Sequence, residues 1–110
     1  MNQLVLNACI AEAKALRYTP AGIPALDLRL EHESEVVEAG QTRQVKAAIK
    51  AVALGALAET LGKRPIGSTG RFSGFLATPR NGKYVVFHVQ EFLADQVSFA
   101  GQTPGSAPPI

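Results

Sequence analysis

Apolar and polar residues alternate with a period of two in several parts of the chain. The clearest case is Ala25–His32, where leucines occupy every second position and charged residues fill the positions between them. Successive side chains of an extended chain point to opposite faces. This segment is therefore predicted to be a strand with one buried and one solvated face.

Four further segments are interpreted as strands: 4–13, 43–52, 70–77 and 84–92. The alanine-rich segment 43–52 is also compatible with a helix, and in both conformations Lys46 and Lys50 share one side. Glycines within 70–77 predict a bulge or a sharp bend. The core is expected to include four phenylalanines: Phe72, Phe75, Phe87 and Phe92.

One segment has a helical period instead. In Leu54–Leu61 the apolar residues follow the spacing i, i+3, i+4, i+7, which predicts a short amphipathic helix. Gly62 is placed to be its C′ cap, and Pro65 prevents the helix from continuing.

The remaining segments are predicted connections. Thr19–Pro24 holds two prolines and a glycine, and Glu33–Thr42 is polar and acidic, so we expect a loop at the first and a loop or hairpin tip at the second. Asn81–Gly82 is a hairpin signal within the turn Thr78–Lys83. Gly101–Ile110 is rich in proline and glycine and is expected to be a flexible tail.

Five strands with a short helix between the third and the fourth give an all-β chain with the element order of an OB-fold barrel. We expect residues 1–100 to form this domain and residues 101–110 to form the tail. OB-folds commonly bind oligonucleotides through strands 2 and 3 and through the loops that join strands 1–2 and 4–5.

Composition excludes several other classes. No apolar run approaches the 18 residues of a membrane helix, and the N-terminus lacks the features of a signal peptide, so a cytoplasmic protein is expected. The single cysteine, Cys9, cannot form an internal disulfide, and two distant histidines do not suggest a metal site. No nucleophile–base arrangement can be argued from spacing, so we expect neither enzymatic activity nor a cofactor.

Charge is unevenly distributed. Residues 1–40 hold three basic and six acidic side chains, whereas residues 41–110 hold eight basic and three acidic ones. Such asymmetry indicates a polyanionic partner for the second part, although an unevenly charged solvated surface gives the same count.

In an OB barrel three groups of side chains would surround the usual groove. Cations there would follow a phosphate backbone, and Tyr18 would stack on a base. His88 is expected on the outer face of the last strand, either stacking on a base or in a structural role, and His32 is expected to be hydrogen-bonded and structural. The groove candidates are Arg17, Tyr18, Lys46, Lys50, Arg80 and Lys83.

Several motifs together are specific. The chain reads RYTPAGIP at Arg17–Pro24, LRLEHES at Leu28–Ser34 and EAG at Glu38–Gly40, and Arg43-Gln44 and Gly74–Leu76 extend the pattern. Over residues 2–93 the sequence resembles the primosomal replication protein N (PriB) family, whose general outline related single-strand binding proteins share.

The resemblance implies a homodimeric OB-fold protein of the replication-restart primosome, without catalytic activity, that binds single-stranded DNA and contacts the restart helicase and a loader protein. Arg17 and Thr19 match DNA-contacting positions of the first loop, and Arg80 and Lys83 match basic positions of the loop between strands 4 and 5. Arg43 belongs to the matched Arg-Gln motif and joins the candidate DNA contacts. Largely apolar residues on both faces of 4–13 agree with a dimer.

The chain departs from the family pattern at three positions. Lys46 stands where some members place a stacking tryptophan, Gln41 where an aromatic residue can occur, and Glu33 where a basic residue can occur. The strand 4–5 loop is also expected to be short. An OB-fold protein-interaction adaptor with little DNA affinity is therefore an alternative. A general single-stranded DNA-binding protein is a second alternative, although the chain ends in SAPPI rather than in an acidic tip.

Overall fold

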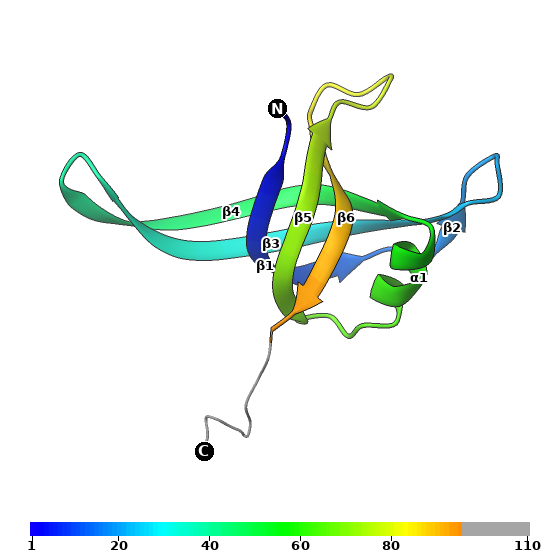
Figure 1. Cartoon of the computed structure of the whole chain (residues 1–110), viewed down its shortest axis with the longest axis horizontal. Coiled ribbons are helices and arrows are strands. Elements are labelled where there is room, and N and C mark those ends of the chain that lie inside the picture. Colours follow the sequence, from blue (N-terminus) through cyan, green and yellow to red (C-terminus); the bar gives the residue numbers. More distant parts are fainter. Residues whose placement is uncertain (96–110) are drawn as a thin grey trace, which may run out of the picture.

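The structure is a computed structural model, and it describes residues 1–95. Six strands and one helix follow one another along the chain (Figure 1). The predicted tail, 101–110, and the end of the predicted domain lie outside the described residues. The elements are β1 (Leu4–Ala13), β2 (Arg17–Tyr18), β3 (Pro24–Glu38), β4 (Gln41–Leu54), α1 (Ala56–Gly62), β5 (Thr69–Ala77) and β6 (Val86–Ala94).

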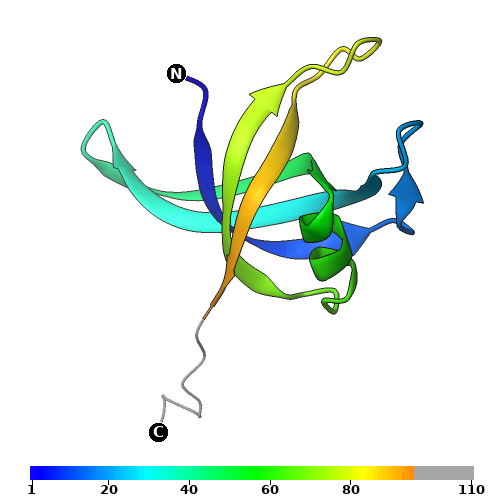
Figure 2. The same cartoon turned by 45° about the vertical axis from the view of Figure 1, so that its right-hand side comes forward.

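The five long strands close into a barrel (Figures 1 and 2). The sheet order is β1-β5-β6-β4-β3-β2, and an additional β1–β3 pairing closes it. All pairings are antiparallel except β4–β6, which is parallel. β1 pairs with β5 through residues 4–9 and with β3 from Cys9 onward, so one strand serves both sides of the barrel. The predicted all-β OB-fold barrel, with its helix between the third and fourth long strands, is confirmed.

The core follows from the alternation along each strand. The largest fully buried side chains come from four of the strands and from α1, which contributes Leu61. Burial of each such apolar side chain contributes about 1.5–3 kcal/mol to the free energy of folding. These side chains are Phe72, Phe87, Ile10, Leu26, Leu30 and Leu61.

Close strand approach explains the glycines of β5. A Cβ built on Gly74 would lie 1.8 Å from the carbonyl oxygen of His88, so only glycine fits there. The β5–β6 register shifts between Ser73 and Gly74. The predicted irregularity in this strand is therefore confirmed as a bulge.

Segment Glu33–Thr42 was predicted to be a loop or a hairpin tip, and the structure has a hairpin there, with most of the segment in its two strands. β3 continues to Glu38, β4 begins at Gln41, and only Ala39 and Gly40 turn the chain, both with positive φ (52° and 77°). The two strands project beyond the barrel as a hairpin arm (Figure 1). Residues 35–44 are exposed on both faces, so the alternation that marks a half-buried strand is lost there.

Three further boundaries differ from the predictions. The predicted strand at 43–52 is confirmed over its helical alternative, but β4 extends further, from Gln41 to Leu54, before Gly55 turns the chain with φ 73°. Gly62 is part of the helix, and the cap is Lys63 in the right-handed region. The β5–β6 connection spans residues 78–85, longer than expected, because β6 begins only at Val86.

Candidate nucleic-acid interface

The outward face of β3 and β4 carries two of the predicted lysines. In the strand register Lys50 lies opposite Arg29, and Lys46 lies opposite Glu33. Lys46 Nζ lies 3.4 Å from a carboxylate oxygen of Glu33, so an opposite charge stands beside it on the same face of the sheet. The prediction that both lysines share one face of a strand is confirmed, and their surroundings differ.

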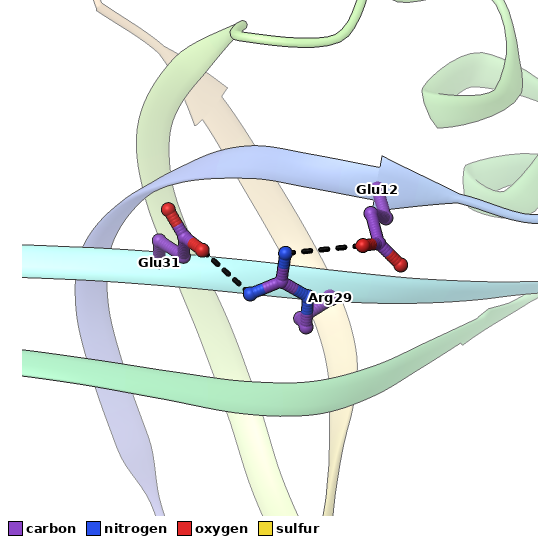
Figure 3. Close-up of polar contacts among 3 residues, drawn as sticks. All are labelled: Glu12, Arg29 and Glu31. Carbon is purple, nitrogen blue, oxygen red and sulfur yellow. Dashed lines mark hydrogen bonds and ion pairs between the residues drawn. The ribbon is translucent and has the colours of Figure 1, made fainter.

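Arg29 lies at the centre of this face between two carboxylates (Figure 3). Its Nη1 donates to Glu31 at 2.5 Å, and its Nη2 donates to Glu12 of β1 at 3.1 Å. Both hydrogen bonds raise the pKa of Arg29, and the one to Glu31 has the larger effect. Arg29 was not among the groove candidates predicted from the sequence, although the alternation of β3 places it on the solvated face.

Arg17 and Tyr18 form the short strand β2 rather than part of a loop, and the connection from β2 to β3 is organised by internal contacts. Arg17 Nε donates to Asp27 at 2.6 Å, and this hydrogen bond raises the pKa of Arg17 and lowers that of Asp27. The Thr19 hydroxyl oxygen accepts from the Ile23 amide at 3.2 Å, so it closes the turn. The predicted stacking residue Tyr18 is 62% exposed beside them.

Arg43 belongs to the hairpin arm rather than to the barrel face. Its guanidinium lies 3.0 Å from the carboxylate of Glu38 across the tip of the arm. The structure therefore separates Arg43 from the candidates on the barrel.

The β5–β6 loop differs from this compensated face. Arg80 and Lys83 lie on it, both exposed, and neither these two nor Lys50 forms an ion pair with a carboxylate within residues 1–95. Lys50 and Lys83 line one open groove of about 730 Å³, whose other walls include Leu4 and Tyr84.

The predicted strand 84–92 would begin with Tyr84. Tyr84 lies instead in the β5–β6 loop, before β6 begins at Val86, and it is 81% exposed. Its place next to Lys83 in the sequence was the signal that could have identified it as a groove residue.

The two histidines have different environments. His32 Nδ1 lies 2.6 Å from the Asn7 carbonyl, which only accepts, so Nδ1 donates and Nε2 is left to accept from the Ser34 hydroxyl at 2.8 Å. The structural role predicted for His32 is confirmed. His88 lies on the outer face of β6 and stacks on Phe75, with ring centroids 4.8 Å apart and 10° between the planes.

The prediction that Phe75 is a core residue was wrong, because it is only half-buried. It occupies the opposite parity from the buried Phe72 and Gly74 on β5. The period of two could have placed it outside.

The described residues hold neither a metal-site cluster nor a membrane-spanning helix. Within residues 1–95, no cluster of three or more histidine, cysteine or acidic side chains has the arrangement of a metal site. The helix in this part of the chain is too short to cross a membrane.

Known proteins share this arrangement. Residues 2–91 match the family described as "Another single-strand binding protein family". The replication restart protein PriB of Bordetella pertussis is 51% identical over 92 residues, which cover 83% of this chain and 86% of that protein. The chain belongs to the PriB family.

Solved structures agree with this assignment. PriB from Ralstonia solanacearum superposes with a TM-score of 0.79 at 34% identity, covering 87% of this chain and 99% of that one. The single-stranded DNA binding protein of Thermus aquaticus gives a TM-score of 0.71 at 25% identity, covering 87% of this chain and 50% of that one. The resemblance to the PriB family inferred from the sequence motifs is therefore confirmed.

Proposed function

We propose that this chain binds single-stranded DNA as a component of replication restart. The observation that carries the proposal is the groove between β4 and the β5–β6 loop, where Lys50 and Lys83 face an open space without a carboxylate partner in the described residues. Cations of this kind neutralise phosphates and release counterions, which is the main source of affinity in sequence-independent binding.

The DNA path follows from the distribution of compensated charge. Arg29 is held by Glu12 and Glu31, so a phosphate approaching the centre of β3 would meet carboxylates as well as a guanidinium. A DNA strand that runs along β4 and under the β5–β6 loop avoids these carboxylates. Phosphate contacts carry no base information, so this mode tolerates any sequence.

The biological setting is proposed from the family. Its relatives are named replication restart proteins, and we place this chain in the same primosome, where it helps recruit or stimulate the restart helicase and the loading of the replicative helicase. In this role the chain is a binding component without catalytic activity, cofactor or metal. By binding single-stranded DNA, the chain would be located at the DNA on which the helicase acts.

A homodimer is part of the proposal. Residues 4–8 of β1 pair with β5 on one side, whereas β3 joins β1 only from Cys9 onward. The opposite edge of this segment is free of strand partners in the described chain, and Val5 on it is 51% exposed. An unpaired apolar strand edge pairs readily with another chain, so sedimentation should show a dimer at micromolar concentration. A monomer at that concentration would exclude this assembly.

The deciding experiment is a titration of a fluorescent oligo(dT) at several salt concentrations. DNA binding predicts that log affinity falls linearly with log salt, with about 0.7 of slope for each phosphate contact. A control titration with a duplex of the same length tests the preference for single strands.

A second candidate is an OB-fold adaptor with little DNA affinity. The ion pairs of Arg17, Arg29, Arg43 and Lys46 favour it, because each removes a cation from the count available to DNA. Absence of binding to oligo(dT) at low salt would replace the DNA-binding proposal with this one.

A further inference from the structure

An aromatic pair lies on the outside of the barrel. Phe75 of β5 and His88 of β6 are register partners, both half-buried, and their rings are nearly parallel. Aromatic side chains of a small β-barrel normally fill its interior, as Phe72 and Phe87 do here. A flat, partly solvated pair on the outer face is therefore not required by the core.

The pair lies at the base of the cationic loop and beside β4. Phe75 is three residues before the loop 78–85, and His88 is three residues after it. His88 is also the register partner of Val52, which follows Lys50 by two positions on the same face of β4. The aromatic pair thus continues the face on which Lys50 is found.

A hollow of about 310 Å³ adjoins the pair, a volume at the lower end of small-ligand sites. Leu54, Leu57 and Gln90 line it together with the two rings. Apolar and aromatic walls suit the faces of a flat heterocycle, and the Gln90 amide can both donate and accept hydrogen bonds at its edge.

We propose that this hollow is a nucleobase subsite, in which one unstacked base of the bound strand packs against His88. The inference rests on the proposed binding of single-stranded DNA and adds a base contact to the phosphate contacts of the groove. It assigns the stacking role to β5 and β6, whereas the centre of β3 and β4 offers charged and alanine side chains instead. A base enters through its ring face, so every base is accepted.

A matched pair of variants tests the subsite. His88→Leu keeps an apolar side chain without a π face, and His88→Phe keeps the flat ring. Oligo(dT) and an abasic deoxyribose-phosphate strand of equal length serve as probes. We expect His88→Leu to weaken oligo(dT) binding by about 5- to 150-fold at every salt concentration, the range of one lost stacking contact, with an unchanged salt slope. His88→Phe should bind within about twofold of the wild type, and all three proteins should bind the abasic strand alike.

A measurement on the unmodified chain gives an independent readout. The sequence has two histidines, so the ring-proton resonances of His88 can be followed with those of His32 as an internal reference. Stacking predicts that oligo(dT) shifts the His88 resonances upfield, that the abasic strand leaves them in place, and that His32 responds to neither. This experiment decides the question even if His88→Leu fails to fold.

The possible failures can be told apart. If the wild type binds neither strand, the proposed DNA binding is wrong and the subsite falls with it. If the wild type binds oligo(dT) while His88→Leu matches it and the His88 resonances stay in place, DNA binding stands and the base subsite is wrong. In that second case the aromatic pair is a structural contact or a protein-docking surface.

Discussion

The outer face of β3 and the groove under the β5–β6 loop both carry cations, and they differ in what surrounds those cations. On β3 and its neighbours, Arg17, Arg29 and Lys46 each contact a carboxylate. At the groove, Lys50 and Lys83 contact none within the described residues. The position of a basic residue on the expected face of an OB barrel therefore does not suffice to predict a phosphate contact. A carboxylate on a neighbouring strand can already pair with that cation and compete with the phosphate.

The largest effect is expected from disrupting the close approach of β5 and β6, the two strands that carry the loop above the groove. Gly74→Ala would place a Cβ 1.8 Å from the His88 carbonyl oxygen and would force β5 away from β6. We expect a loss of about 3 kcal/mol or more in the free energy of unfolding, measured by chemical denaturation. Gly62→Ala is the control, because its Cβ meets nothing within 4 Å and alanine favours the helix. Equal stability of the two variants would contradict the close approach of β5 and β6.

The difference between free and ion-paired cations is tested by removing two cations of the groove in one variant and two ion-paired cations of the β3–β4 hairpin in another. Lys50→Ala with Lys83→Ala should weaken oligo(dT) binding by roughly 30-fold at low salt, taking about 1 kcal/mol per contact, and should reduce the salt slope by about 1.4. Arg43→Ala with Lys46→Ala removes the same charge from ion-paired positions, so its effect should be several-fold smaller. Fluorescence anisotropy at several salt concentrations measures both. If the second pair has the larger effect, the strand follows the hairpin arm and the groove is the wrong site.

A gain of affinity is expected from freeing Arg29. Glu12→Gln with Glu31→Gln leaves its guanidinium without carboxylate partners and makes it available to a phosphate. The salt slope should increase by about 0.7 for the one added contact, with tighter binding at low salt. Glu59→Gln with Glu91→Gln is the control of equal charge, since neither residue forms an ion pair in the described part of the chain. An equal gain of affinity in both variants would show that the change in net charge, rather than the release of Arg29, is the cause.

The smallest effect concerns the Arg17–Asp27 pair and its dependence on pH. Arg17 lowers the pKa of Asp27 in the folded chain, so the pair stabilises the fold above the unfolded value of about 3.9 and ceases to do so as pH falls through the lower folded value. Asp27→Asn should cost less than about 1 kcal/mol at neutral pH, because the pair is exposed to solvent. Thermal melting of both proteins should converge at acidic pH, and a difference that persists there would show that the pair is not its cause.

The barrel was predictable from the sequence because its strands have one dry face. Leu26 and Leu30 reveal β3 by their period, and the spacing of leucines reveals α1. The length of the strands in the hairpin arm was not predicted, for the opposite reason: Val36 and Val37 are both exposed, so no alternation marks the end of β3. Lys46 and Glu33 are neighbours because the β3–β4 pairing continues through residues 33–38, which the sequence did not identify as part of a strand.

The candidate site was predictable in its positions and less so in its contacts. The alternation placed Lys50 and His88 on outer faces, as the structure has them. Arg29 meets Glu12, which is 17 positions away along the chain, and no local pattern announces such a contact. Local periodicity therefore assigns a side chain to a face, and the closure of the barrel decides its neighbours.

The order of strand pairing has a consequence for folding kinetics. β3 and β4 form fourteen Cα pairs across a two-residue turn, whereas the β1–β5 ladder joins Leu4 to Gly74. Contacts close in sequence have the smaller loop-closure entropy and form early, while distant pairings form late and limit the rate. The groove takes its walls from β1, β4 and the β5–β6 loop, so it exists only after the last of these pairings. A nascent or partly unfolded chain would then have the hairpin arm but no groove for single-stranded DNA. DNA binding would therefore begin only after the barrel has closed.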